Sequence, residues 1–517
     1  MARHKKALHP DAPLLNLGHG RPVTRRDFLR QGFISGMGLT LGGSIMSLFA
    51  TPRAARAANP NLSQDLNDLA ASIQCFLGGG ALNPLPVICF DLAGGANIAG
   101  SNVLVGRSDQ LDVLTTAGYS RLGLPGDMIP GVAEANPSPT SDGLHVDTTM
   151  GLAFHSDSAF LRGILEKAGT RGANVHGVVI PARSDNDTGN NPHNPMYRLA
   201  AAGASGGVVT LIGSRNSDSG GNSMAAPPLD PEIRPTKVDR PSDVVGMVDT
   251  GDLTAVLKTK EDVVAVMESV ARLSNKKLDR VSTGLTADDV VKDLVRCGYL
   301  KAADLAERFA NRDIDPSTDS LIVDDATGIF TQAEFNGDRE FQKTASVMKM
   351  VIDGHAGVGT IAMGGYDYHT GDRATGEIRD LRAGRCIGAC LEYAARSATP
   401  VMIYVFSDGS LTSNGTVDNS PEGRGKGVWT GDNSSTAASF LLVYNPRGPV
   451  PSLRNQIGFF RADGSVETSS SPAANNVNLL AETVVLNYLA LQGREGEYSG
   501  PLGSNFANLL AFGDIIS

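Results

Sequence analysis

Four carboxylates and one histidine stand at or just after the ends of apolar runs, where a folded sheet can present reactive side chains. They are Asp91, Asp367, His369, Asp408 and Asp432. Oxygen and imidazole ligands suit zinc, manganese and similar divalent ions. Side chains alternate along an extended segment, so Asp367 and His369 are expected to point to the same side. We therefore predict that at least two of these residues share a divalent metal ion, zinc or manganese.

A polar loop at 183–194 provides the second set of candidates. It precedes an expected helix, whose N-terminal N–H groups and dipole favour anions. Beside a metal, Thr188 or Ser184 can act as the nucleophile. Arg183 is a candidate anion clamp, and His193 is a further candidate ligand. The competing interpretation is structural, because Asp and Asn side chains also cap helices and form turns, and a core His is commonly just hydrogen-bonded.

The elements that must position these residues alternate between strands and helices. Apolar runs predict strands at 85–91, 174–180, 207–212, 400–408 and 439–444. Helical patterns lie at 158–168, 195–202, 337–353, 380–397 and 476–491. Such alternation is typical of a layered α/β sheet, in which ligands bind beyond the carboxyl ends of the strands.

One region of different composition interrupts this alternation. Residues 214–242 are rich in Ser, Asn, Pro and Gly, which predicts a loop, and 251–311 have a helical pattern. Thr259 and Thr286 each precede acidic residues in the manner of a capping box, which indicates two helix starts. We predict a helical insertion beside the sheet at about 214–345.

The first 58 residues have the pattern of an export signal. Arg25 and Arg26 form a twin-arginine pair, an apolar Gly-rich run follows, and Ala55-Arg56-Ala57 is an A-x-A type cleavage site. This order predicts a Tat signal peptide at 1–58, the Tat translocase as a partner during export, and a periplasmic or secreted mature protein. No later segment is apolar for long enough to span a bilayer, so no permanent membrane span is expected.

Charge and composition exclude two classes of protein. The chain has 45 Lys+Arg and 55 Asp+Glu, of which the leader holds 9 and 2, leaving 36 and 53 and a net charge of −17. Such an acidic protein lacks the basic face that binds phosphate backbones, so nucleic acid is not an expected partner. With 41% hydrophobic residues the chain can bury a large core, which excludes wholesale disorder.

The five cysteines are too few for a disulfide-built scaffold of this size. Their odd number leaves at least one thiol free or paired outside the chain. Cys386 and Cys390 stand four apart in an expected helix, on one face, and the C-x-x-C pairs of a four-Cys zinc site are lacking. We expect buried cysteines, room for one bridge, and no cysteine chemistry.

Several motifs, taken in order, resemble a bacterial family called domain of unknown function 1501. Its members are often Tat-exported and are placed in the alkaline-phosphatase-like (sulfatase-like) superfamily. The most specific match is 364–369, Gly-Gly-Tyr-Asp-Tyr-His, which resembles the family's Gly-Gly-Trp-Asp-Thr-His. The other matching pieces are Phe154-His155-Ser156-Asp157, His193 ten residues before Gly203, Ser407-Asp408-Gly409 with Thr412 and Asn414, and Gly431-Asp432-Asn433. The similarity covers most of the mature chain.

The resemblance implies a three-layer α/β/α sandwich of the alkaline-phosphatase-like type over 59–517, and metal-assisted hydrolysis of phosphate or sulfate esters. Three positions depart from the family pattern. Asp408 replaces a Glu and can still bind a metal, whereas Asn433 replaces a His and removes the strongest imidazole ligand of its loop. Pro192 stands where the family has a Ser.

The sequence thus predicts an exported, metal-dependent hydrolase-like protein that acts on a small-molecule ester. Its rival is a non-catalytic exported binding or assembly protein that keeps the fold and has lost the metal chemistry. Asn433 favours the rival, and the Asp367–His369 pair favours the enzyme. A redox protein with an organic cofactor ranks last, because the sequence has neither a Cys cluster nor a nucleotide fingerprint.

Overall fold

The computed structural model describes residues 59–73, 75, 77, 84–184, 193–214, 235–248, 257, 259–284, 288–309, 314–504 and 506–515. Two compact units divide the chain. The helical unit comprises 58–77 and 245–312, and the sheet unit comprises 78–244 and 313–517. The predicted Tat signal peptide, Thr188, Pro192 and the expected helix start at Thr286 lie outside the described residues.

A seven-stranded mixed sheet forms the centre of the sheet unit. Its strands, in spatial order, are β4 (Val175–Pro181), β11 (Ala438–Tyr444), β8 (Val401–Phe406), β1 (Val87–Ala93), β7 (Ala356–Gly364), β5 (Val209–Gly213) and β6 (Thr236–Lys237). Strands β8, β1, β7, β5 and β6 run parallel to one another, whereas β11 runs antiparallel to both β8 and β4. The five strands expected from apolar runs are therefore confirmed within one or two residues at most ends.

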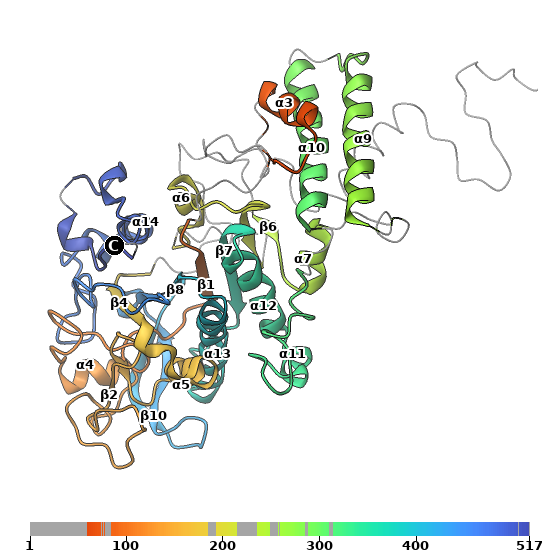
Figure 1. Ribbon diagram of the computed structural model, residues 1–517. Helices are drawn as coiled ribbons and strands as arrows, with labels where there is room; N and C mark the ends of the chain where they lie inside the picture. Colours follow the sequence, from red (N-terminus) through yellow and green to blue (C-terminus); the bar gives the residue numbers. More distant parts are fainter. Residues whose placement is uncertain are drawn as a thin grey trace, which may run out of the picture. The chain divides into compact units, whose positions relative to one another are not determined.

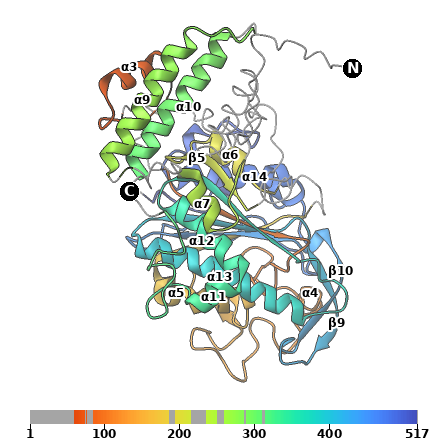
Figure 2. The ribbon, with the colours of Figure 1, turned by 90° about the vertical axis from the view of Figure 1, so that its right-hand side faces the viewer.

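Helices cover both faces of this sheet (Figure 2). On one face lie α5 (Ala159–Ala168), α12 (Arg339–Ile352) and α13 (Ala374–Arg396), and on the other lie α6 (Met196–Ala201) and α14 (Val477–Ala490). Successive residues of β7 face opposite sides of the sheet. A side chain at Gly359 would meet Val347 and Val351 of α12, whereas Thr360 Oγ1 accepts a hydrogen bond from Asn194, just before α6. The architecture is mixed α/β, as predicted, and is compatible with a sandwich.

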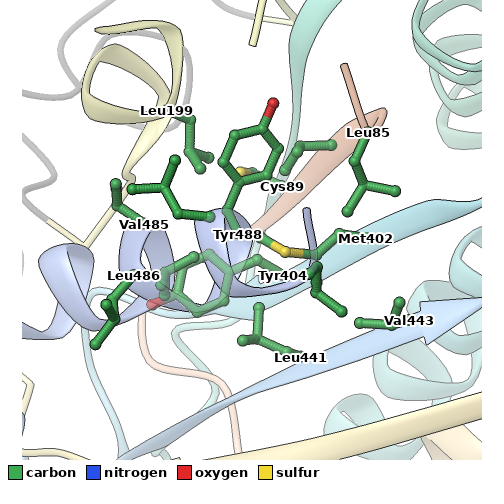
Figure 3. Close-up of a cluster of buried hydrophobic side chains, with 14 of the residues drawn as sticks. Leu85, Cys89, Leu199, Met402, Tyr404, Leu441, Val443, Val485, Leu486 and Tyr488 are labelled. Carbon is green, nitrogen blue, oxygen red and sulfur yellow. The ribbon is translucent and has the colours of Figure 1, made fainter. Parts of the chain in front are cut away.

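The core on the α6 and α14 face is apolar (Figure 3). Alternate strand residues, among them Cys89, Tyr404 and Leu441, pack there against Leu199 of α6 and Tyr488 of α14. Each is less than 5% exposed, and full burial of a large apolar side chain contributes about 1.5–3 kcal/mol. Because helices cover the strands, the sequence of each strand is nearly continuously apolar.

Shorter elements complete the sheet unit. They are α4 (Thr116–Arg121), α11 (Gln332–Gly337), the β2 (Val146–Asp147) and β3 (Phe154–His155) pair, and the hairpin of β9 (Leu411–Asp418) with β10 (Lys426–Asp432). Helix α7 (Pro241–Val248) stands where the chain passes from one unit to the other.

The helical unit contains α3 (Gln64–Ser72), α9 (Lys260–Leu278) and α10 (Asp288–Phe309), with α9 and α10 side by side (Figure 1). The hydroxyl of Thr259 accepts a hydrogen bond from the Asp262 N–H, which confirms the helix start expected there. The helices expected within the predicted insertion are present. The helical unit, however, covers only 245–312 of the predicted 214–345, and it also includes 58–77 from the start of the described chain.

Polar contacts and a disulfide hold that early segment against α9 and α10. The Asn59 side chain donates to Asp304 (2.8 Å), and the Ser63 N–H donates to Glu268 (2.7 Å). A disulfide joins Cys75 to Cys297 across 222 residues. Cys89, Cys386 and Cys390 are buried thiols, so the single bridge leaves three cysteines in the core, in keeping with the expectation from the sequence.

Candidate metal centre

Three side chains from two segments converge beyond the carboxyl end of β7. Asp367 and His369 follow that strand, and Asp432 is the last residue of β10. His369 Nε2 lies 2.8 Å from Asp367 Oδ1 and 3.8 Å from Asp432 Oδ2. One ligand atom from each residue lies within 4.8 Å of the other two. We call Asp367, His369 and Asp432 the ligand triad.

Alternating side chains orient the first two members of the triad. Tyr366 and Tyr368 are buried; the Tyr366 hydroxyl donates to a backbone carbonyl of α13 (3.0 Å), and the Tyr368 hydroxyl donates to Asp380 Oδ1 (3.2 Å). Asp367 and His369 point the other way, with 66% and 32% of their side chains exposed. The tyrosines therefore attach this segment to α13 and leave both ligands facing solvent, as the spacing of Asp367 and His369 predicts.

The attachment requires a glycine in the first turn of α13. A Cβ at Gly376 would lie 2.8 Å from a ring carbon of Tyr368, too close for any larger residue. Helix α13 begins at Ala374, six residues earlier than the sequence pattern predicts. This additional length places Gly376 and Glu377 beside the segment that carries Asp367 and His369. The residues of this turn are mostly polar, so apolar periodicity in the sequence does not indicate a helix there.

Backbone pairing positions the third member of the triad. Asp432 pairs with Leu411 of β9, which follows β8 in the chain, and the Asn433 N–H donates to the Ser410 carbonyl (2.9 Å). The Gly371 N–H donates to the Trp429 carbonyl (2.8 Å), which joins the ligand segment after β7 directly to β10. Two segments some 60 residues apart in the sequence thus reach one site.

The geometry of the triad fits a divalent ion. Zinc binds His nitrogen and carboxylate oxygen at about 2.0–2.2 Å, so tetrahedral ligand atoms lie about 3.4 Å apart. The distances from His369 Nε2 to Asp367 and Asp432 bracket that value at 2.8 and 3.8 Å. With a metal bound, three protein ligands at a site open to solvent would leave a coordination position for water or a substrate, which is the pattern of catalytic rather than structural zinc sites.

Asp408 lies on the adjacent turn but outside the triad. Its Oδ1 accepts a hydrogen bond from the Gly94 N–H (2.8 Å). Gly94 has φ +120°, and a Cβ there would lie 2.6 Å from the Asp367 nitrogen. Asp408 therefore holds the glycine turn after β1 against the ligand segment. The predicted role of Asp408 as a ligand stays a prediction.

Asp91 and His193 occupy a buried position on the α6 face of the sheet. Asp91 pairs with Phe406 across β1 and β8, and the Phe406 ring stacks on His193 with centroids 6.5 Å apart. Asp91 is fully buried, and burial lowers the pKa of His193 to about 4. The imidazole is therefore neutral at pH 7, the form that binds metals. Phe406 thus neighbours both residues, and neither belongs to the triad.

Two guanidinium groups contact the turn that follows Asp432. Arg183 Nη2 donates to Ser434 Oγ (3.0 Å), and Arg121 Nη2 donates to Ser435 Oγ (3.1 Å). Ser434 stands two residues after Asp432, so their Cα atoms lie within about 7 Å. Arg183 was a candidate from sequence, whereas no pattern around Arg121 marks it, since only the fold carries α4 to this turn.

Asn433, which stands where the resembled family has a His, does not project as a ligand. Its side-chain oxygen accepts hydrogen bonds from the Ser435 N–H (2.9 Å) and hydroxyl (2.6 Å). The amide therefore caps the short 3₁₀ turn from Ser434 to Thr436. His369 is therefore the one imidazole that the triad offers to a metal.

The comparisons with known proteins leave the family open. No protein-family model matches the chain, and no curated protein or solved structure is detectably similar to it. Among the helices that the structure describes, none is long and apolar enough to cross a membrane.

Proposed function

We propose that this protein is an exported, metal-dependent hydrolase-like protein that acts on phosphate or sulfate esters. The observation that carries the proposal is the ligand triad, in which Asp367, His369 and Asp432 come within 4.8 Å of one another from two distant segments. Zinc or manganese is the metal that suits two carboxylates and one imidazole. The alkaline-phosphatase-like form of the α/β fold, and the resemblance to domain of unknown function 1501, belong to the same proposal.

A divalent ion in such a site polarises an ester oxygen and lowers the pKa of a bound water or hydroxyl. The chain supplies the groups that hold the anionic part of the substrate: Arg183 and Arg121, whose guanidiniums lie beside the turn after Asp432. Guanidinium groups match the geometry of phosphate and sulfate oxygens and stay charged at any working pH. Thr188 is the proposed nucleophile.

Export by the Tat route is the second part of the proposal. The twin-arginine leader motivates it, and the Cys75–Cys297 disulfide supports it. Disulfides persist mainly in oxidising compartments such as the bacterial periplasm and are rare in the cytosol. A periplasmic or secreted location therefore agrees with the covalent structure of the helical unit.

The test is elemental analysis of the mature protein, purified without chelator, beside an Asp367→Ala/His369→Ala double variant. We expect about one equivalent of zinc or manganese for the three-ligand triad, lost in the double variant because a single carboxylate, Asp432, is left to bind it. Glu261→Ala is the matched control, since Glu261 is an exposed carboxylate of α9 in the other unit, and it should retain the metal.

Metal-loaded protein is then assayed against phosphate and sulfate monoesters. Hydrolysis that requires the metal and disappears in the double variant supports the enzyme. The absence of stoichiometric metal from the unmodified protein contradicts the proposal outright, and metal retained by the double variant places the ion elsewhere.

One observation favours the non-catalytic alternative. Asn433 replaces an imidazole and is engaged in capping its own turn, which leaves a site with fewer ligands than the resembled family would have. A binding or assembly protein with this fold would bind metal weakly or not at all and would hydrolyse none of the esters. Metal analysis and the ester assay together separate the two functions.

A further inference from the structure

One carboxylate oxygen joins the two segments that carry the ligand triad. Glu377 Oε1, in the first turn of α13, accepts hydrogen bonds from Arg373 Nη2 (2.6 Å) and from Lys426 Nζ (3.0 Å). The side chains of all three residues are at most 3% exposed. Arg373 stands four residues after His369, and Lys426 stands six residues before Asp432. We call Arg373, Glu377 and Lys426 the buried ionic link.

The link is surrounded by further contacts between the same two segments. The guanidinium of Arg373 lies over the ring of Trp429, 4.7 Å from its centroid. Its Nη1 also donates to the Gly427 carbonyl (3.4 Å). Arg373 therefore contacts β10 directly at Gly427 and Trp429, and β10 ends in Asp432.

Burying these charges is costly. Burial lowers the pKa of Lys426, and it would raise that of Glu377, but Lys426 and then Arg373 outweigh it and hold the carboxyl below its usual range. Replacing a buried ion pair by apolar residues of similar volume is often neutral or stabilising. Stability alone therefore gives little reason for three ionised groups under the ligand segment, and their position suggests another role.

We propose that Glu377 and Lys426 are positioning residues for the metal site: their contact sets the separation between the Asp367–His369 segment and Asp432. This inference rests on the proposed function, since it needs a metal at the triad. Neither residue touches the ion. They act through Arg373 on one side and through strand β10 on the other, and so fix the spacing of ligands that come from separate parts of the chain.

The test compares zinc affinities, measured by competition with a chromophoric chelator, of the unmodified protein and Lys426→Met. Methionine retains the volume of lysine and removes its charge, and Glu377 keeps Arg373 and Arg162 as partners. We expect the zinc Kd to rise about 10–100-fold, the effect typical of removing residues that orient metal ligands. The visible spectrum of the Co²⁺-substituted protein should change as well, because it reports the arrangement of ligands.

Lys349→Met is the matched control. Lys349 is also a buried lysine bonded to a carboxylate, Asp319 (2.5 Å), but it joins α12 to a segment that carries none of the triad. The control should lose comparable stability and keep its zinc affinity within about 3-fold, well below the effect expected for an orienting residue.

A second variant guards against misfolding of the first. Tyr368→Phe removes only the hydroxyl that links the ligand segment to Asp380 and to the Asn97 N–H (3.2 Å), and it should also weaken zinc binding. Unchanged affinity in both Lys426→Met and Tyr368→Phe would overturn the positioning role while leaving the metal site intact. Equal losses in Lys426→Met and Lys349→Met would overturn it too. If the unmodified protein binds no zinc, the proposed function fails, and this inference fails with it.

Discussion

The sheet unit and the helical unit achieve burial in opposite ways. In α14 of the sheet unit, 12 of 14 residues are buried, and they pack on an apolar core. In α9 of the helical unit, only four of 19 are buried, and one of these is Glu268. Most of the stability of a helix in a protein comes from packing of its apolar face. The helical unit therefore needs another source of stability.

Specific contacts with the segment 58–77 provide that source. Asn59, Glu268 and Asp304 are less than 9% exposed; Asn59 donates a hydrogen bond to Asp304, and Glu268 accepts one from the Ser63 N–H. The Cys75–Cys297 disulfide closes the unit. Each buried polar group of this kind that lacks a hydrogen-bond partner would destabilise the folded state by about 1–3 kcal/mol. Where the apolar core is thin, the chain depends on directed polar contacts and a covalent bond, which only one arrangement of the segments satisfies.

The largest effect is expected from weakening the apolar core. Leu441→Ala, in β11, should lower the free energy of unfolding of the sheet unit by about 2–5 kcal/mol, because it leaves a cavity among fully buried side chains. The single tryptophan, Trp429, lies in the sheet unit, so its fluorescence in urea reports that unit alone. Leu453→Ala, at a leucine that is 58% exposed, is the control and should have little effect. Similar losses from both variants would contradict the assignment of the core.

A smaller effect, confined to the other unit, is expected from removing the disulfide. Cys75→Ser/Cys297→Ser should destabilise the helical unit by about 2–4 kcal/mol, because the loop between the two cysteines is no longer constrained in the unfolded chain. Hydrogen exchange of α9 and α10 peptides should accelerate, while the Trp429 transition in urea stays in place. A Trp429 midpoint that falls by an equivalent amount would mean that the two units unfold as one.

A third effect, seen only as a change with pH, is expected within the sheet unit. Burial, and then the charge of Glu377, raises the pKa of Asp380 to about 7. A carboxyl whose pKa is higher in the folded than in the unfolded state contributes stability at low pH that is lost as pH rises, here between about 4 and 7. This loss of stability is at most about 1.4 kcal/mol per pH unit for one group, and Asp380→Asn should remove it.

The variant is therefore expected to gain stability relative to the unmodified protein as pH rises from 5 to 8, in urea unfolding followed by Trp429. Asp109→Asn, at an exposed carboxylate, should show no such gain. A pH profile of Asp380→Asn parallel to that of the unmodified protein would mean that Asp380 ionises normally.

Much of the fold could be predicted because its signals are local. The apolar run at 85–91 and the cap at Thr259 correspond to β1 and to the start of α9. The proximity of Asp367 and His369 follows from side-chain alternation over three residues. The N-terminal extension of α13 escaped prediction because its first turn has no apolar periodicity: Gly376 is buried against the Tyr368 ring, and Glu377 is buried through ionic contacts.

Local pattern therefore accounts for the class of fold, the acidic charge of the chain and the candidate ligands themselves, whereas the leader stays a prediction. Tertiary structure alone decided which of those ligands meet, that Asn59 and Cys75 join a helix pair more than 200 residues away, and that Glu377 connects Arg373 to Lys426. The physical reason is the range of the forces. Secondary structure reflects backbone sterics and burial over a few residues, whereas a metal site needs ligands from separate segments, and their separation is set by how the whole core packs.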